Sequence, residues 1–197
     1  MTLGLQLPEG SATEGVVIGI DPGSDTLGFA CIHYNLKTRE ITRSYSKTFK
    51  ASSMYLSPVT KQTHGARYAR IYKLAEVLLE MFLQINPTHV VCESPFMAMR
   101  RPQAYGALME TVFAIRTAAR NYDESLALDL VDPPSAKNAV GAPGNAKKEQ
   151  VYAALFKMLE QIAYDKSEYD VEFAKLDEHS IDALAIAFWR MKKLQQE

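Results

Sequence analysis

The chain has 197 residues, of which 47% are apolar and 23% charged, and its formal net charge is −1. This length suits one domain with a core of its own, and the composition excludes a disordered or fibrous protein. The balance of charges excludes a general attraction to nucleic acid, so any DNA-binding surface must be local. No apolar stretch is long enough to span a bilayer, and we expect no membrane partner.

The first residues differ in character from the rest. Residues 1–15 contain glycine and proline but no apolar segment of the kind found in signal peptides, so we expect a flexible N-terminal tail. Residues 16–197 are expected to form a single domain. Cys31 and Cys92 each lie in an apolar, strand-like segment. This placement predicts buried thiols in a reducing, cytoplasmic compartment rather than a disulfide or a zinc site.

The expected domain opens with a pattern typical of a β-hairpin. Residues 16–20 are apolar or small and lead into Asp21, Pro22 and Gly23. Proline fixes φ and glycine tolerates positive φ, so these residues favour a turn. A second apolar run follows at residues 27–34. The hairpin therefore carries a carboxylate at the end of its first strand, and a turn cap or a metal ligand are both consistent with that position.

The remaining pattern alternates between apolar runs typical of strands and spacings of three or four residues typical of helices. In chain order it predicts a strand, a loop, a helix, a strand, a loop, a helix and a strand at residues 41–49, 51–62, 66–84, 88–93, 95–102, 103–121 and 126–131. It then predicts a short helix, a loop, a long helix, an insert and a last helix at residues 136–140, 141–146, 147–162, 163–175 and 177–194. Asp132 and Asp177 are expected to cap the helices that follow them. Three strands followed by alternating helices and strands predict an α/β fold, with a mixed sheet of antiparallel and then parallel strands and helices on both faces.

Three carboxylates stand where these elements can bring them together. Asp21 and Glu93 end two expected strands, and Asp182 lies beside the apolar stripe of the last helix. His179 and Glu178 precede Asp182 by three and four residues, so both compete for its helix face. Carboxylates with one imidazole suit Mg²⁺ or Mn²⁺, and two such ions about 4 Å apart can act on a phosphodiester. A local cap and an ordinary histidine are the alternative, but acids from three separate elements favour a metal site.

Four short motifs follow one another along the chain. They are G-I-D-P-G-S with G-F four residues on, E-S-P-F-M-A, A-K-N-A-V leading to A-K-K-E-Q-V, and H-S-I-D-A-L-A-I-A, at residues 19–29, 93–98, 136–151 and 179–187. Each alone is weakly specific, but in this order they resemble the RuvC family of Holliday junction resolvases over residues 16–189. The resemblance implies an RNase H-like fold and a metal-dependent, structure-selective endonuclease. Such an enzyme resolves four-way DNA junctions by paired symmetric nicks in recombination and repair.

The resemblance also implies roles for individual residues. The ligands it implies for two Mg²⁺ or Mn²⁺ ions are Asp21, Glu93, His179 and Asp182, with His179 either a ligand or an aid to the attacking water. Lys137 and Lys148 fall on basic positions near the scissile phosphate, Lys148 among the catalytic residues, and Phe96 on an aromatic that stacks at the junction centre. Three further basic residues join this expected DNA surface, unless they are only solvated charges: Arg100, Arg101 and Lys147.

A homodimer is expected, because a four-way junction has near two-fold symmetry and its resolution needs two matched nicks. Gly106 and Ala107 are candidates for the subunit contact, or else pack against the sheet. Three features depart from the family pattern and bear on substrate preference: Asp25, the long segments 50–63 and 163–175, and an overall charge less basic than that of most DNA enzymes.

Other functions are weighed against this one. The segment 141–148 nearly matches a phosphate-binding P-loop, but Ala146 replaces a glycine and no serine or threonine follows the lysines, so we expect no nucleotide cofactor. The first hairpin also resembles that of actin-like ATPases, which need two such domains. A junction-binding module without catalysis, or a nuclease for branched DNA more broadly, remains as the alternative.

Overall fold

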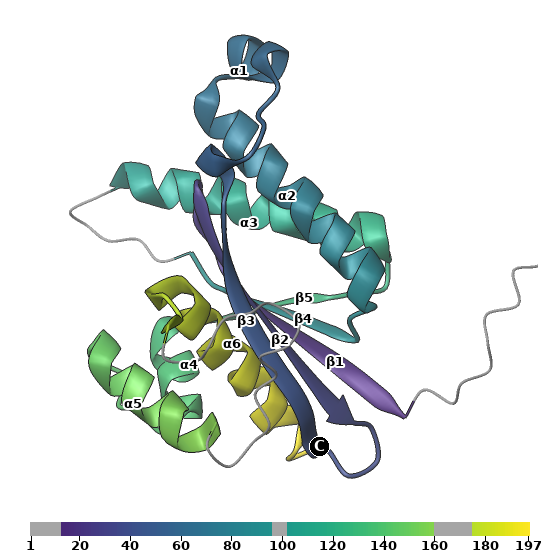
Figure 1. Cartoon of the computed structure of the whole chain (residues 1–197), viewed down its shortest axis with the longest axis vertical. Helices are drawn as coiled ribbons and strands as arrows, with labels where there is room; N and C mark the ends of the chain where they lie inside the picture. Colours follow the sequence, from purple (N-terminus) through teal and green to yellow (C-terminus); the bar gives the residue numbers. More distant parts are fainter. Residues whose placement is uncertain (1–12, 96–101, 160–174) are drawn as a thin grey trace, which may run out of the picture.

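The structure, a computed structural model, describes residues 13–95, 102–159 and 175–197. In this part of the chain one sheet has the strand order β3-β2-β1-β4-β5 (Figure 1). Its strands are β1 Glu14–Asp21, β2 Thr26–Asn35, β3 Ile41–Lys50, β4 His89–Glu93 and β5 Leu128–Val131. The pairs β1–β2 and β2–β3 are antiparallel, whereas β1–β4 and β4–β5 are parallel. The predicted mixed sheet is confirmed.

Helices cover both faces of this sheet, as predicted (Figure 1). Helices α2 (Ala66–Ile85) and α3 (Pro102–Tyr122) pack on one face, where Ile18 and Ile20 of β1 are buried. Helices α4 (Pro133–Ala139), α5 (Lys148–Leu159) and α6 (Glu178–Leu194) cover the other face, toward which Val17 points. The alternation along β1 follows from the two-residue period of a strand. It assigns Asp21, four residues after Val17, to the face covered by α6.

Helix α6 lies unusually close to β1. A Cβ atom at Gly19 would collide with the backbone carbonyl of Ala183 and the amide of Ala187, so only glycine permits this approach. The expected buried stripe of α6 is confirmed at Ile181, Leu184, Ala185 and Phe188, whereas Trp189, predicted to belong to it, is only half-buried. Ile186 is buried as well, because the helix also packs against α4 and α5. The packing fixes the helix that carries two of the expected site residues.

One expected loop is helical. The segment 51–62 contains a 3₁₀ turn, η1 (Ala51–Ser53), and most of a short helix, α1 (Pro58–His64), which projects beyond the sheet (Figure 1). The Ser57 hydroxyl accepts a hydrogen bond from the Thr60 amide at 3.2 Å, and Pro58 follows at the first helical position. Serine then proline is a helix-start signal as well as a loop composition, and the loop prediction here was wrong.

The two expected helix caps are confirmed. The side chain of Asp132 accepts from the Ser135 amide, and that of Asp177 from the Ser180 amide, each at 2.9 Å. Helix α4 begins at Pro133, three residues before the predicted start, because the two prolines after Asp132 suit the first turn. Strand β1 begins at Glu14, within the expected tail. The rest of that tail, and nearly all of the insert at 163–175, lie outside the described residues.

The structure also bears on the two cysteines and on membrane-spanning helices. Cys31 and Cys92 are both buried, and neither is in a disulfide. Across the described ranges, no helix combines the length and the apolar character needed to cross a bilayer.

Candidate active site

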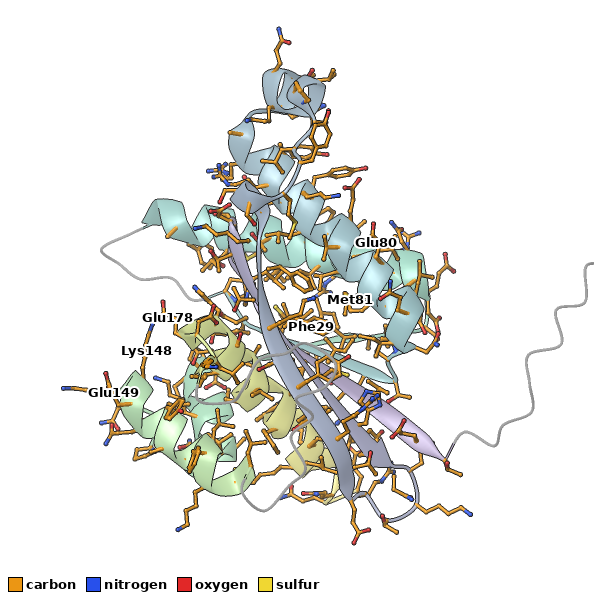
Figure 2. All side chains as sticks on the ribbon, in the orientation of Figure 1. Phe29, Glu80, Met81, Lys148, Glu149 and Glu178 are labelled. Atoms are coloured by element: carbon orange, nitrogen blue, oxygen red, sulfur yellow. The ribbon has the colours of Figure 1, made fainter. Side chains whose placement is uncertain are left out.

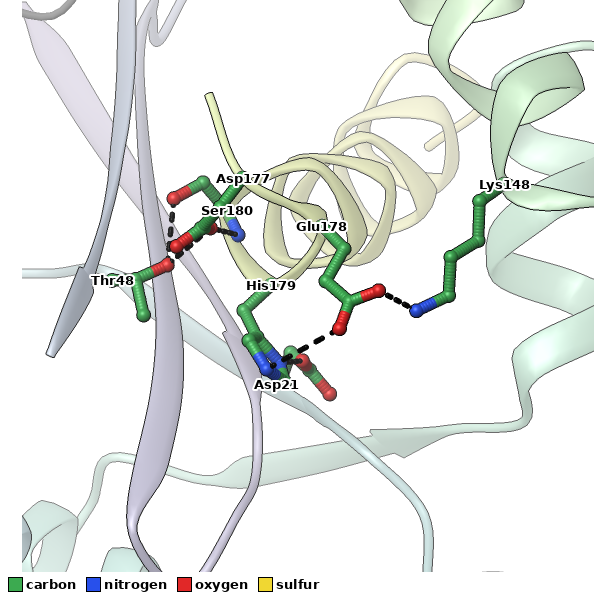
Figure 3. Close-up of polar contacts among 7 residues, drawn as sticks. All are labelled: Asp21, Thr48, Lys148, Asp177, Glu178, His179 and Ser180. Carbon is green, nitrogen blue, oxygen red and sulfur yellow. Dashed lines mark hydrogen bonds and ion pairs between the residues drawn. The ribbon is translucent and has the colours of Figure 1, made fainter. Parts of the chain in front are cut away.

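Asp21 is the last residue of β1 and meets the first turn of α6. Its Oδ2 lies 2.7 Å from Nδ1 of His179 (Figure 3). The helix backbone reaches this point because Gly28, the partner of Asp21 on β2, has no side chain. A Cβ atom at Gly28 would collide with the carbonyl group of His179. The hairpin glycine of the first motif therefore makes room for the helix that carries the last motif.

The contact between His179 and Asp21 fixes the orientation of the imidazole. A carboxylate only accepts hydrogen bonds, so Nδ1 of His179 donates and Nε2 is the nitrogen left to act as a ligand or base. The hydrogen bond to Asp21 raises the pKa of His179 against the opposing effect of burial, and the charges of Asp177 and Asp182 add to the rise. Nε2 lies 3.9 Å from Oε1 of Glu178.

Glu93 and Asp182 have strongly perturbed acidities. Burial, followed by the negative charges of Asp21 and Asp182, raises the pKa of Glu93 to about 7. Burial and the charge of Asp21 likewise raise the pKa of Asp182 to about 6. Carboxylates from β1, β4 and α6 are therefore close enough to repel one another, as the sequence predicts for this end of the sheet.

These side chains are neighbours without forming a closed cage. Within the described ranges, no three histidine, cysteine, aspartate or glutamate side chains lie close enough together to coordinate one ion as they stand. The donor set nevertheless fits a divalent cation, because partly buried carboxylates that repel one another are stabilised by a 2+ charge between them. Oxygen donors with one imidazole match the preference of Mg²⁺ and Mn²⁺.

Two of the three predicted lysines act on this cluster. Lys137 of α4 lowers the pKa of both Glu93 and Asp182 and donates from Nζ to the carbonyl of Ala146 at 2.9 Å. Lys148, the first residue of α5, also lowers the pKa of Asp182. Lys147 is exposed, and its backbone amide donates to the side chain of Gln150. The positive charges of Lys137 and Lys148 thus partly offset the carboxylates.

Lys148 forms an ion pair with Glu178 across the gap between α5 and α6 (Figure 3). Figure 2 shows Lys148, Glu149 and Glu178 on the same side of the molecule. A hollow of about 280 Å³ opens here beside the cluster. Its lining residues are Lys148, Glu149, Tyr152, Glu178, Ile181 and Asp182. The sequence singled out Glu178 only as a competitor of His179 for one helix face, and its pairing with Lys148 is visible only in the fold.

The structure gives Asp25 a local role. Its carboxylate accepts from the amide and the hydroxyl of Ser52 at 2.9 and 3.0 Å, and lies 3.5 Å from Nε of Arg70. Asp25 therefore ties the hairpin turn to η1 and α2. The negative charge of Asp25 therefore faces Arg70 of α2.

Three predicted DNA-binding residues cannot be placed in this geometry. Phe96, Arg100 and Arg101 lie outside the described residues, and their roles stay predictions. The described chain stops shortly before this segment, and Glu93 ends β4. Ser94 continues the sheet pairing for one step, since its amide donates to the carbonyl of Val131 at 2.8 Å.

The chain is similar to known proteins of one family. The family described as "Crossover junction endodeoxyribonuclease RuvC" matches residues 17–189. A protein of that name from Cytophaga hutchinsonii is 24% identical over 149 residues, 73% of this chain and 64% of the relative. One from Chlorobium phaeovibrioides is 29% identical over 150 residues, 73% of this chain and 69% of the relative. The chain thus spans about two thirds of each relative.

Among solved structures, the Thermus thermophilus RuvC in complex with a Holliday junction substrate has a TM-score of 0.67 and 22% sequence identity. The match covers 92% of this chain and 96% of the Thermus chain. This likeness confirms the predicted RNase H-like fold.

Proposed function

Because the chain belongs to the RuvC family of crossover junction endodeoxyribonucleases, we propose that it cleaves four-way DNA junctions by paired, symmetric, metal-dependent nicks. The observation that carries this proposal is the cluster of carboxylates from β1, β4 and α6, in which burial, followed by the charge of Asp21, raises the pKa of Glu93 and of Asp182. The repulsion between the ionised carboxylates destabilises the folded protein, and carboxyls perturbed in this way are concentrated at functional sites.

The proposed metal ligands are the residues that the sequence indicates: Asp21, Glu93, His179 and Asp182. Two bound Mg²⁺ or Mn²⁺ ions would supply charge stabilisation and an activated water for phosphodiester hydrolysis. Asp21 has a second task in this proposal, because its hydrogen bond with Nδ1 holds the imidazole of His179 so that Nε2 faces the reacting groups. The raised pKa of Glu93 means that it must lose its proton near neutral pH before it can hold a cation.

The proposed DNA contacts lie on both sides of this cluster. Lys148 and Lys137 would bind the phosphate that is cut, since both already interact with Asp182. Phe96 would stack on a base at the centre of the junction, with Arg100, Arg101 and Lys147 contributing to the surrounding surface. We place the enzyme with the DNA in a reducing compartment, a placement supported by the two buried thiols.

We propose that a second copy of the chain completes the enzyme. An apolar groove of about 380 Å³ runs between α2 and α3, and Tyr68, Tyr72 and Phe113 on its walls are 48%, 50% and 71% exposed. Arg67 and Glu110 form an ion pair beside it at 2.8 Å. Gly106 is exposed and a Cβ atom there would meet no neighbour, so packing against the sheet does not explain it.

The decisive experiment offers the protein a labelled four-way junction, a Y-fork and a linear duplex, each with and without Mg²⁺ or Mn²⁺. The proposal expects metal-dependent nicks at symmetric positions in the junction, each leaving a 5′-phosphate, with the linear duplex uncut. Binding without cleavage would favour the junction-binding module, and equal cutting of the Y-fork would favour a broader branched-DNA nuclease. Sedimentation of the free protein tests the dimer, which a monomer at micromolar concentration would contradict.

A further inference from the structure

We propose that Thr48 of β3 is a positioning residue, which fixes the first turn of α6 on the sheet and so sets the contact between His179 and Asp21. Its importance for catalysis rests on the proposed nuclease function, but the positioning itself does not. Thr48 is separated from Asp177 by 129 residues and belongs to none of the sequence motifs.

One row of residues crosses the sheet beneath the first turn of α6. Asp21 of β1 pairs with Gly28 of β2, and Gly28 pairs with Thr48 of β3. Residues paired across neighbouring strands point to the same face, so all three face α6. The helix turn lies over this row, with the His179 side chain at Asp21 and the His179 carbonyl above Gly28.

Thr48 holds the third point of the row through a chain of hydrogen bonds (Figure 3). Its hydroxyl donates to Oδ1 of Asp177 and lies 2.8 Å from the hydroxyl of Ser180. A threonine has one hydroxyl proton, which goes to the carboxylate, so the Thr48 oxygen can only accept from Ser180, whose hydroxyl also hydrogen-bonds to Asp177. Asp177 in turn accepts from the Ser180 amide at 2.9 Å, which closes the network.

The network brackets His179 on both sides. Asp177 stands two residues before it and Ser180 directly after it, and Ser180 is only 2% exposed. Without the Thr48 hydroxyl, the cap between Asp177 and Ser180 would remain, but it would no longer be tied to β3. The helix turn would then be held by Gly28 and by the His179–Asp21 bond itself. A shift of about 1 Å in a catalytic group can cost about 10²-fold in rate.

The variants Thr48→Val and Thr48→Ser separate positioning from folding. Valine keeps the branched shape that suits a strand and removes the hydroxyl, whereas serine keeps the hydroxyl. Thr42→Val is the matched control, because Thr42 lies on the same strand as Thr48 but far from the cluster. Its hydroxyl also donates to a carboxylate, that of Glu14 on β1, at 2.9 Å. All three variants are assayed on the full chain, with a melting curve for each.

Two measurements test the proposal. In protein with ¹⁵N-labelled histidine and no metal, the signal of the hydrogen-bonded Nδ1 proton of His179 should shift or broaden in Thr48→Val and stay unchanged in Thr48→Ser and Thr42→Val. In junction cleavage, Thr48→Val should lower kcat about 10- to 100-fold with the Kd for junction DNA changed less than about twofold. A Thr48→Val protein that keeps the His179 signal unchanged, or that loses stability but no more kcat than Thr42→Val, would overturn the proposal. If the parent cuts no junction, the proposed function fails while the histidine signal still decides the positioning.

Discussion

The two sides of the first turn of α6 are built differently. On the sheet side, short side chains from Asp21 and Thr48 meet the helix at a point where Gly28 lets the backbones approach. On the α5 side, the long side chains of Lys148 and Glu178 form an ion pair while 64% and 50% exposed. The partly buried hydrogen bonds of His179 with Asp21 and of Thr48 with Ser180 fix a geometry, whereas an exposed ion pair such as Lys148–Glu178 contributes only about 0–1 kcal/mol and is easily exchanged. The difference indicates a rigid side, which would orient the proposed catalytic groups, and an exchangeable side, from which Lys148 would be released to a phosphate in the proposed function.

The largest effect should come from the carboxylate that anchors the rigid side. Asp21→Asn removes one negative charge and leaves only a neutral amide oxygen to accept from His179, so junction cleavage in Mg²⁺ should fall by about 10³-fold or more. Junction binding should persist, because the lysines are untouched. Cleavage is followed on gels and binding by fluorescence anisotropy. Undiminished cutting would show that the site is elsewhere.

The next largest loss is expected from Gly28→Ala. The added methyl group would collide with the His179 carbonyl and lie 3.1 Å from Cβ of Asp21, so α6 must move away from the sheet. We expect kcat to fall about 10²-fold. Gly15→Ala is the control for stability alone, since its methyl group would collide with the ring of Tyr34 at the other end of β1. If both variants lose activity only in proportion to their melting temperatures, close packing at Gly28 has no catalytic importance.

The acid cluster predicts a pH-dependent response to metal. The folded protein raises the pKa of Glu93 to about 7 and that of Asp182 to about 6, above their ordinary values. Protonation of these groups therefore favours the folded state, and this contribution is lost as pH rises through about 6 to 7. Mg²⁺ binds the ionised form and should raise Tm by about 5 °C at about pH 8, but hardly at about pH 5.

Glu93→Gln is the control for that titration, because glutamine removes the ionisation at similar size. In this variant the difference in Tm shift between the two pH values should become smaller. A parent protein whose Mg²⁺-induced shift is the same at both pH values would contradict the assignment of Glu93 and Asp182 to the metal site.

The smallest effect belongs to the exchangeable side. Glu178→Gln frees Lys148, so junction affinity without metal should rise about two- to fivefold. Glu149→Gln, which removes the same charge from the rim of the same hollow, should change affinity less. In a Lys148→Met background the effect of Glu178→Gln should vanish. An equal gain in affinity from Glu149→Gln, or a gain from Glu178→Gln that survives Lys148→Met, would show that affinity depends on net charge and not on the release of Lys148.

The sequence predicts the elements and the acids well, because both depend on local patterns. Apolar runs with carboxylates at their ends place Asp21 and Glu93, and helical spacing puts His179 on the same face as Asp182. The sequence does not predict contacts that depend on strand register or helix docking. Thr48 meets Asp177, and Lys148 meets Glu178, only because β3 and α5 are brought to the start of α6 by the fold. Helix α1 was missed for a different reason, since Ser57 and Pro58 suit both a loop and a helix start.

Carboxylates from β1, β4 and α6 are proposed to hold divalent cations jointly, and titration with Mn²⁺ followed by electron paramagnetic resonance tests this proposal most directly. The parent should bind two Mn²⁺ per chain, and Asp21→Asn, Glu93→Gln and Asp182→Asn should each weaken binding about tenfold or more. Binding that is unaffected by any of these three substitutions would contradict the account.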